Sequence, residues 1–579
     1  MKKFLIIFIL LTWDVDTSSQ NDDKQSNIIE TNSGKIQGKI VINNCNYHYE
    51  FLGIPYAEPP VGKLRFKPPT PVLPWSDVFQ AFEDGPMCLQ RPSHWFPNAT
   101  MSEDCLTLNI FTNEINEDEP KPVMIWIHGG GFAAGRKDGY KMQPVLDEDV
   151  ILVTVNYRLH ALGFLSFGNN LVSGNMGLKD QHLAVQWVRQ NIRYFGGDPE
   201  RITLFGQSAG GISVQAHVIS PFNQGLQFSG IAQSGSILYL SVETPGIEKK
   251  FAKNAAEALD CPVTLDQETL DCLQNIDATA LVVNITDPDD AMFVNSFNDV
   301  KFSYWPNIDD YADEPFLPMD PLKALMEGSF NKVPYITGTT KNEGSYVNRA
   351  YGVAGAEGAD AVEYIKYPAT IGFNLHYGQE QIFNDVALKF YNHTDGDSPY
   401  ELEKPAIDFS TDTNFLSYDQ KSSELMSHHI DSVYNYYFTQ KTNRSRSNLG
   451  MDYTPQHGDD EVFLVSDDPL DDMVGVSEEE MMTMRKMIKY WTNFAKTGNP
   501  NSEISNFTKW LPVNKDEMNY LELKAQPAMK KNVNHERMYF LNQMIWREKE
   551  TQVFKSNGVG DLFGKCIYLI VLSSLCLIL

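Results

Sequence analysis

The sequence predicts an α/β protein in which a large, mostly parallel central sheet is flanked by helices. One observation favours this class, and a second favours a single domain. Short, continuous apolar runs alternate with helical patterns along the 579 residues, as parallel strands joined by crossover helices require. No linker rich in Pro, Gly and Ser divides the body, and no repeat period is present. We therefore expect residues 20–555 to form one domain.

The elements follow one another in the order that such a sheet needs. Apolar runs predict strands at residues 123–127, 151–155, 202–205, 231–233, 333–336 and 433–438. Amphipathic patterns predict helices at 178–192 and 484–495, and Gly498 and Pro500 end the second one. The segment between Glu343 and His457 is rich in charge and helical pattern, which predicts helical cap insertions.

Both ends of the chain have the pattern of processing signals. Residues 1–19 combine two lysines, an apolar run and a polar end, which predicts a secretory signal peptide cleaved near Ser18 or Ser19. Residues 556–579 combine small residues, a spacer and a terminal apolar stretch, the order of a glycosylphosphatidylinositol (GPI) attachment signal. A short tail anchor is the alternative, but the 13 residues 567–579 span a bilayer poorly. We expect an extracellular protein, secreted or anchored to the cell surface.

An exported chain is expected to carry glycans and disulfides. Five sequons are present, at Asn98, Asn284, Asn392, Asn443 and Asn506. Among the seven cysteines the local pairs are Cys88 with Cys105 and Cys261 with Cys272, which leaves Cys45 without a partner outside the removable tail. No CxxC pattern or His-rich cluster indicates a metal, and no cofactor is expected.

The charge balance argues against nucleic acid as a partner. The chain has 75 acidic and 47 basic residues, a formal net charge of −28. Such a surface disfavours nucleic-acid binding and attracts cationic solutes, although solubility alone explains it equally well.

Two glycine-rich motifs, each after an apolar strand, carry the catalytic signal. The pentapeptide Gly206–Gly210 (GQSAG) follows a strand and precedes a helix of small residues, the context of a nucleophile elbow in the α/β-hydrolase fold. It puts Ser208 at a helix N-terminus, where the Ala209 N–H and the helix dipole favour an oxyanion. Upstream, His128–Phe132 (HGGGF) matches an oxyanion loop. An ordinary Gly-rich turn is the alternative for each motif.

A nucleophilic serine needs a base and an acid downstream of it. In this fold the order is Ser, acid, His, which removes every histidine before Ser208. Among the later ones, His457 lies in a loop of turn-forming residues. Glu343 follows the strand at 333–336, on the side where sites form at a sheet edge. The alternative for Glu343 is an ordinary solvated carboxylate.

From about Gly34 to Trp546 the chain resembles the type-B carboxylesterases, and within them the cholinesterase group. The matching segments include FLGIPYAEPPVGKLRF, SEDCLTLNIFT, WIHGGGF, FGQSAGG, NEGS and QHGDDEVF. The resemblance implies that Ser208 is the nucleophile, His457 the general base and then acid, and Glu343 the residue that orients the imidazole. It also implies an oxyanion hole made by the N–H groups of Gly130, Gly131 and Ala209.

The resemblance extends to residues that would bind a choline ester. Trp95, in WFPNATMSEDC, matches the choline-binding tryptophan, and Tyr346 matches a second flanking aromatic; indole faces attract quaternary ammonium groups. The alternative is that Trp95 is a buried loop aromatic. Phe302 matches an acyl-pocket aromatic, whereas Val300 and Val347 are smaller than usual, which implies a tolerance for acyl groups longer than acetyl. Gln207 replaces the family's Glu and removes a negative charge beside the bound cation.

The sequence therefore favours a membrane-anchored serine esterase that hydrolyses choline esters with relaxed acyl preference. The first alternative is a carboxylesterase of broad or hormone-ester specificity without choline preference. The second is a non-catalytic, neuroligin-like adhesion protein, which an intact Ser208, Glu343 and His457 disfavour. By analogy with relatives that dimerise through C-terminal helices, residues 538–549 are a candidate homodimer interface.

Overall fold

A computed structural model of the chain describes most of this domain. The described residues are 24–43, 46–92, 99–140, 142–242, 246–285, 304–345, 404, 407–445, 454–464, 476–501, 507–514 and 517–556.

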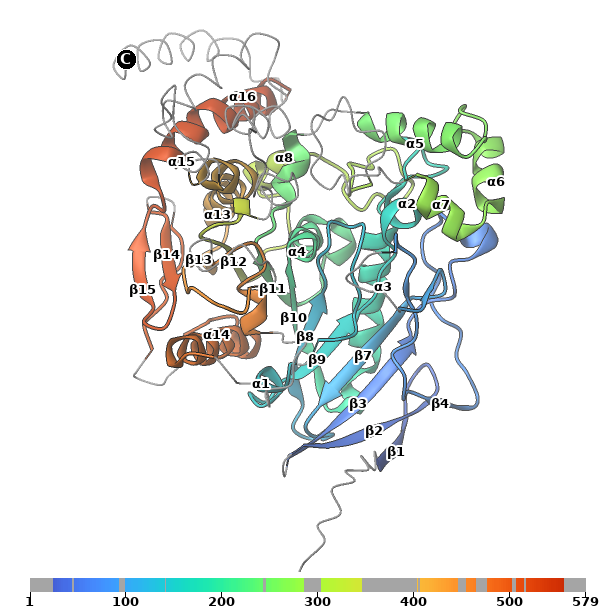
Figure 1. Ribbon diagram of the computed structural model, residues 1–579, viewed down its shortest axis with the longest axis horizontal. Coiled ribbons are helices and arrows are strands. Elements are labelled where there is room, and N and C mark those ends of the chain that lie inside the picture. The colour runs from blue at the N-terminus through green and yellow to red at the C-terminus, as the bar shows by residue number, and fades with distance from the viewer. Residues whose placement is uncertain are drawn as a thin grey trace, which may run out of the picture.

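A thirteen-stranded sheet forms the centre of the molecule (Figure 1). The strands of this sheet are β1 (Lys24–Glu30), β2 (Lys35–Asn43), β3 (Asn46–Pro55), β4 (Val78–Gln80), β7 (Thr107–Thr112), β8 (Lys121–Ile127), β9 (Ile151–Val155), β10 (Gly197–Gln207), β11 (Phe228–Gln233), β12 (Tyr335–Thr340), β13 (Val433–Phe438), β14 (Asn519–Leu523) and β15 (Ala528–Lys531). Their order is β1-β2-β3-β7-β9-β8-β10-β11-β12-β13-β14-β15, and β4 pairs with β2. Two short strands, β5 (Met87–Cys88) and β6 (Met101–Ser102), pair separately.

The sheet is parallel through its centre and antiparallel at both edges. Neighbours from β9 to β14 are parallel, whereas the successive pairs from β1 through β2, β3 and β7 to β9 at one edge, and the β14–β15 pair at the other, are antiparallel. Strand β4 pairs with β2 in parallel. This arrangement is the predicted mostly parallel sheet flanked by helices, and the predicted fold class is confirmed.

Helices cover both faces of the sheet. The described helices are α1 (Gln143–Leu146), α2 (His160–Phe164), α3 (Met176–Asn191), α4 (Ala209–Ile219), α5 (Ile247–Ala258), α6 (Gln267–Asn275), α7 (Ala278–Asn284), α8 (Pro321–Glu327), α13 (Ser417–Ser427), α14 (Glu478–Thr497), α15 (His535–Leu541) and α16 (Arg547–Ser556). The alternation of β8 shows the two faces. Met124 and Trp126 join a buried cluster with α14 and α1, whereas Val123, Ile125 and Ile127 join the other cluster, with α3 and α4.

The predicted elements are present, with shifted ends. Strand β12 begins at Tyr335 and not at residue 333, because Pro334 has no N–H to donate to a ladder. Helix α14 begins at Glu478, six residues before the predicted start. Its first turn is acidic and shows no apolar period; a capping box between Ser477 and Glu480 begins the helix there. The predicted helical cap falls largely on residues 346–403, outside the described residues.

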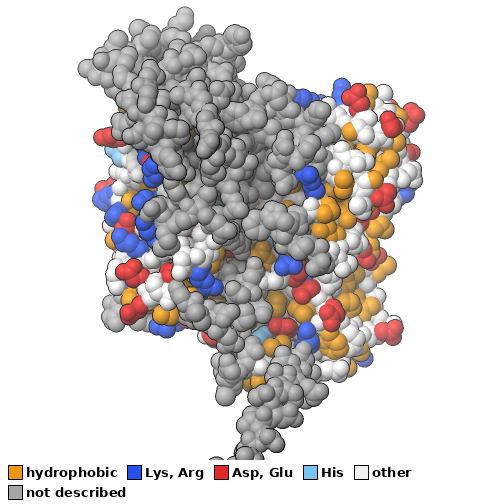
Figure 2. Space-filling model, in the orientation of Figure 1, with side chains coloured by type: hydrophobic (Ala, Val, Ile, Leu, Met, Phe, Trp, Pro, Cys, Tyr) orange, Lys and Arg blue, Asp and Glu red, His pale blue; other side chains and the backbone are white. Residues whose placement is uncertain are grey.

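Both expected disulfides are formed, with Cα–Cα distances of 5.0 Å for Cys88–Cys105 and 5.8 Å for Cys261–Cys272. Of the sequons, Asn284 and Asn443 are exposed; Asn98, Asn392 and Asn506 lie outside the described residues, as does Cys45. None of the described helices is long and apolar enough to cross a bilayer. On the face in Figure 2, acidic and basic side chains of the described residues are interspersed, without a continuous basic surface.

Candidate active site

The serine motif forms a sharp turn between β10 and α4. Ser208 has φ 58° and ψ −122°, a conformation that costs energy for any residue except glycine. The flanking glycines are required by close packing: a Cβ at Gly206 would lie 2.5 Å from the Ile127 carbonyl oxygen, and one at Gly210 would collide with the same oxygen. The turn therefore presents Ser208 at the carboxyl end of a central strand, at the N-terminus of α4.

The glycine loop after β8 lies against this turn. Strands β8 and β10 are parallel, with Ile127 paired with Gly206, so the residues that follow them meet at one edge of the sheet. A Cβ at Gly129 would lie 3.2 Å from the Cβ of Ser208. The N–H groups of Gly130, Gly131 and Ala209 donate to no residue that the structure describes. Unpaired N–H groups beside a serine suit a developing oxyanion.

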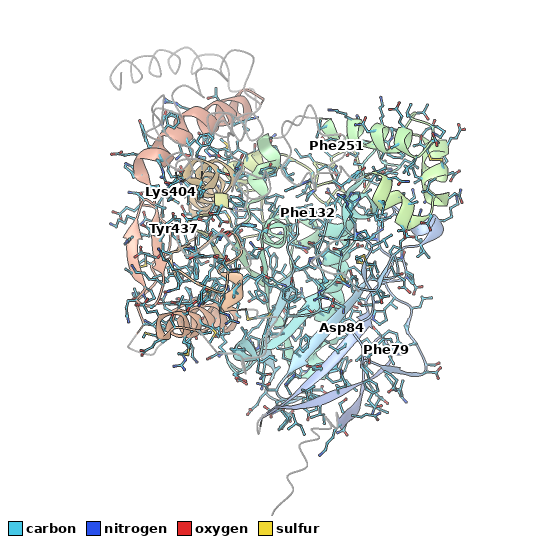
Figure 3. The ribbon with its side chains drawn as sticks, viewed as in Figure 1. Phe79, Asp84, Phe132, Phe251, Lys404 and Tyr437 are labelled. Carbon is cyan, nitrogen blue, oxygen red and sulfur yellow. A yellow bond between two sulfur atoms is a disulfide. The ribbon has the colours of Figure 1, made fainter. Side chains whose placement is uncertain are left out.

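The loop ends on a buried aromatic side chain. Phe132, labelled near the centre of Figure 3, is fully buried and packs against Phe164 and Trp305, with ring centroids 4.9 and 5.5 Å away. Trp305 in turn stacks on Tyr239 at 5.3 Å. This aromatic packing anchors the loop beyond its three glycines.

The expected acid and base are hydrogen-bonded to each other. His457 Nδ1 lies 2.6 Å from Oε2 of Glu343, whose side chain is fully buried. The other carboxylate oxygen, Oε1, accepts from the hydroxyl of Ser234 and from the N–H of Thr340, each at 2.6 Å. These three bonds fix the carboxylate and, through it, the imidazole. The sequence reasoning missed Ser234, which follows β11 directly and so lies at the same sheet edge.

The other nitrogen of the imidazole contacts Gln207. The amide nitrogen of Gln207, Nε2, lies 3.2 Å from His457 Nε2. With Nδ1–H donated to Glu343, Nε2 carries a lone pair, and the amide N–H donates to it. The Ser208 hydroxyl makes no hydrogen bond to any described residue. Gln207, expected at a substrate site, thus occupies the position on the ring that a nucleophilic serine would use.

The loops that carry the acid and the base are joined directly. Asn342, beside Glu343, forms a bridge with Gln456, and its N–H donates to the Pro455 carbonyl at 3.0 Å. Its side-chain amide donates to the Thr454 carbonyl at 3.2 Å. One residue therefore holds residues 454–456 against the end of β12.

Two carboxyl groups that sequence reasoning did not single out lie immediately after His457. Asp459 and Asp460 are buried, and burial, with the nearby Glu343 charge, raises the pKa of each to about 6. Oδ2 of Asp460 accepts from the hydroxyl of Tyr436 at 2.6 Å and from the amide of Gln233 at 3.1 Å. Its Oδ1 has no hydrogen-bond partner among the described residues.

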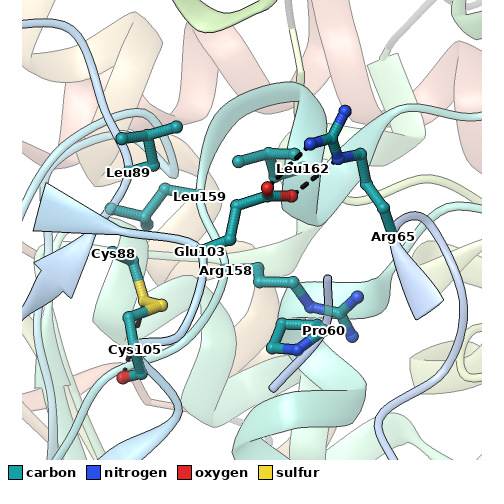
Figure 4. Close-up of a pocket in the computed structure, with 9 residues that line it drawn as sticks. All are labelled: Pro60, Arg65, Cys88, Leu89, Glu103, Cys105, Arg158, Leu159 and Leu162. Carbon is teal, nitrogen blue, oxygen red and sulfur yellow. Dashed lines mark hydrogen bonds and ion pairs between the residues drawn. A yellow bond between two sulfur atoms is a disulfide. The ribbon is translucent and has the colours of Figure 1, made fainter. Parts of the chain in front are cut away.

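Two cavities among the described residues are too small for an ester, and neither is lined by Ser208, His457 or Glu343. Figure 4 shows the first, of about 10 Å³, between the Cys88–Cys105 disulfide and a bidentate ion pair of Arg65 with Glu103. The second, of about 30 Å³, is lined partly by Tyr304 and Trp305. Such volumes suit about one or two water molecules. The predicted choline-site and acyl-pocket residues Trp95, Tyr346 and Phe302 lie outside the described residues.

No group of three or more His, Cys, Asp or Glu that could hold a metal ion is found within the described ranges. A central parallel sheet whose middle strand runs through a strained serine turn into a helix is the defining feature of the α/β-hydrolases.

Comparisons with known proteins place the chain within that class. Residues 25–541 match the model of the carboxylesterase family. The chain is 34% identical to a carboxylic ester hydrolase of Bombus ignitus, an alignment that covers 90% of this chain and 93% of the relative. It is 32% identical to the cocaine esterase of Homo sapiens (91% and 93%) and 31% identical to venom carboxylesterase-6 of Apis mellifera (91% and 94%).

The chain belongs to the carboxylesterase family and is a carboxylic ester hydrolase. The family-level prediction is confirmed. The names of these three relatives are carboxylic ester hydrolase, venom carboxylesterase-6 and cocaine esterase, and none of them is named as a cholinesterase, so the cholinesterase subgroup stays a prediction.

Proposed function

We propose that Ser208, His457 and Glu343 hydrolyse esters in two acyl-transfer steps. The observation that carries this proposal is the 2.6 Å bond between His457 and the buried Glu343, next to a strained serine turn with unpaired N–H groups. His457 Nε2 takes the proton of the Ser208 hydroxyl as Oγ attacks the ester carbonyl. The N–H groups of Gly130, Gly131 and Ala209 stabilise the tetrahedral oxyanion.

Completion of the cycle uses the same groups in reverse. The imidazolium, stabilised by Glu343, gives its proton to the departing alcohol and leaves an acyl group on Ser208. Water, deprotonated by His457, then attacks the acyl carbonyl, and the imidazolium returns its proton to Ser208 Oγ as the acid product leaves. Gln207 must release Nε2 before Ser208 can use it. Catalytic hydrogen bonds are often absent from unliganded enzymes and form in the substrate complex.

A fluorophosphonate probe tests the nucleophile. Covalent labelling should be complete in the wild type and absent in Ser208→Ala. It should be slower but still complete in Ser234→Ala, which removes a donor to Glu343 and keeps the proposed nucleophile. Persistent labelling of Ser208→Ala, with the mass of the adduct on another residue, would overturn the proposal.

We infer that the enzyme hydrolyses esters without a preference for choline, which is the first alternative stated from the sequence. Gln207 supports this inference because it is 95% buried, carries no charge and is bonded to the base. No carboxylate is therefore provided at that position for a cationic alcohol group.

Choline esters are the second candidate, supported by Trp95, Tyr346 and the net charge of −28. Acetylthiocholine, butyrylthiocholine and phenyl acetate, compared in wild type and Trp95→Ala, separate the two. A choline esterase would lose activity on the charged esters selectively in Trp95→Ala. Equal activities on all three esters, unchanged in the variant, would exclude choline recognition.

We further propose an exported, membrane-anchored protein, with the signal peptide at 1–19 and the GPI signal at 556–579. The exposed sequons Asn284 and Asn443 and a relative named as a venom protein support export. Phosphatidylinositol-specific phospholipase C should release activity from intact cells. Within the candidate dimer stretch 538–549, Leu541 and Trp546 are buried in their own chain, whereas Tyr539 is 54% exposed and is available to a second copy.

A further inference from the structure

The orientation of a peptide plane decides whether an oxyanion hole works. In a trans peptide the C=O and N–H groups point in opposite directions. The N–H of Gly130 therefore points away from the carbonyl of Gly129, and whatever holds that carbonyl also aims the N–H. Because glycine lies on both sides of this peptide, its backbone rotates at little steric cost, and an external hydrogen bond must fix it.

That hydrogen bond comes from His128. Its Nδ1 lies 2.8 Å from the Gly129 carbonyl oxygen. A carbonyl oxygen only accepts, so the proton of the ring is on Nδ1. Burial lowers the pKa of His128 to about 4, so the ring is neutral near pH 7 and has a single N–H, which this bond uses.

The ring itself is rigidly held. His128 is 1% exposed and stacks on Tyr157, with centroids 4.5 Å apart and planes inclined by 20°. The Tyr157 hydroxyl donates to the main-chain carbonyl of His128 at 2.8 Å. A Cβ at Gly135 would collide with Nδ1, so the loop closes over the ring on that side.

The next peptide plane is held differently. The Gly130 carbonyl accepts from the N–H groups of Ala133 and Ala134 at 3.1 and 2.9 Å, which aims the N–H of Gly131. Main chain alone holds this second plane. The Gly129–Gly130 peptide plane depends on the side chain of His128, so a substitution at position 128 can test it.

We propose that His128 is a positioning residue of the oxyanion hole, which aims the Gly130 N–H by holding the Gly129 carbonyl. The inference rests on the proposed function, since it concerns the hole that serves Ser208. It assigns a role to the first residue of the HGGGF motif, which touches neither substrate nor nucleophile.

Three variants test this role. His128→Phe keeps a ring on Tyr157 and removes the donor; His128→Asn keeps an N–H near the position of Nδ1 and removes the ring. Tyr490→Phe is the control, because it removes a tyrosine hydroxyl that donates to a main-chain carbonyl, that of Thr508 at 2.8 Å, on helix α14 and away from the glycine loop. Rates are measured per active site, counted by fluorophosphonate titration, so that unfolded protein does not contribute.

We expect kcat for phenyl acetate to fall ~10–100-fold in His128→Phe with little change in KM, below the ~10²–10³-fold loss from deleting an oxyanion donor outright. Affinity for a trifluoromethyl ketone, whose serine adduct carries the oxyanion, should fall by the same factor. His128→Asn should recover most of both losses, and Tyr490→Phe should change neither by more than about threefold.

A purely structural role would lower the melting temperature and the number of active sites while leaving per-site kcat and ketone affinity unchanged. That result in His128→Phe, or a loss of kcat without loss of ketone affinity, would overturn the inference. Failure of the proposed function is distinguishable, because the wild type itself would then resist the fluorophosphonate.

Discussion

Replacement of Gln207 by Glu is the sharpest test of the contact on the base. The change is isosteric, but it puts a carboxylate 3.2 Å from His457 Nε2 in place of an N–H donor. At that distance a carboxylate and an imidazolium attract by about 1.3 kcal/mol in water and about 5 kcal/mol at an effective dielectric constant of 20. One pH unit corresponds to about 1.4 kcal/mol. The carboxylate should therefore stabilise the protonated, inactive form of the base by at least about 1.3 kcal/mol relative to wild type.

The assay is the pH dependence of kcat/KM for phenyl acetate, followed by pH-stat titration from about pH 5 to about pH 9. Because His457 must be neutral to accept the Ser208 proton, the acidic limb should move upward by at least about one unit in Gln207→Glu. Gln207→Met, which has neither donor nor charge, separates loss of the hydrogen bond from gain of the carboxylate. An active Gln207→Glu enzyme whose acidic limb coincides with that of the wild type would refute the contact.

Other perturbations give equally definite expectations. Glu343→Gln should lower kcat about 10⁴-fold, since an amide at this position favours the wrong imidazole tautomer; per-site rates on phenyl acetate measure it, and near-normal activity would contradict the assigned acid. The pKa of Asp460 is raised from 3.8 to about 6, so the folded state binds the extra proton and wild-type stability declines as pH rises from about 4 to about 6. Asp460→Asn should therefore be more stable than wild type by ~1–3 kcal/mol at pH 8 and equal to it below about pH 4, as urea unfolding would reveal. Loss of the Cys88–Cys105 disulfide, with a sequence separation of 17, should cost about 3 kcal/mol of stability, and an unchanged melting temperature in the double Ala variant would exclude that.

The central strands were predictable because they are buried on both faces. Strands such as β8 and β9 are continuous apolar runs, a pattern that parallel sheets impose. The edge strands were not predicted. Strand β1 buries only two of its seven residues, and its polar pattern resembles a loop. Its strand conformation depends on pairing with β2, which a local pattern does not reveal.

In the candidate site, too, some residues were predictable from local sequence and others were not. Motifs singled out Ser208, His457 and the glycine loop because turn chemistry leaves a local signature. The contact of Gln207 with His457 joins residues 250 positions apart and follows from how the loops meet in space. The bonds from Ser234 to Glu343 and from Gln233 to Asp460 likewise arise because β11 ends level with β10. The roles of Trp95, Tyr346 and Phe302 stay predictions.

Asn342 couples two parts of the machinery mechanically. Because it fastens residues 454–456 to the end of β12, the imidazole of His457 and the carboxylate of Glu343 form one assembly, while Ser208, the proposed nucleophile, belongs to another, built on β10 and α4. Displacement of either loop carries the other with it and changes the gap to the serine, leaving the Glu343–His457 bond intact. We therefore expect partial unfolding to abolish activity by separating His457 from Ser208 before either assembly itself unfolds.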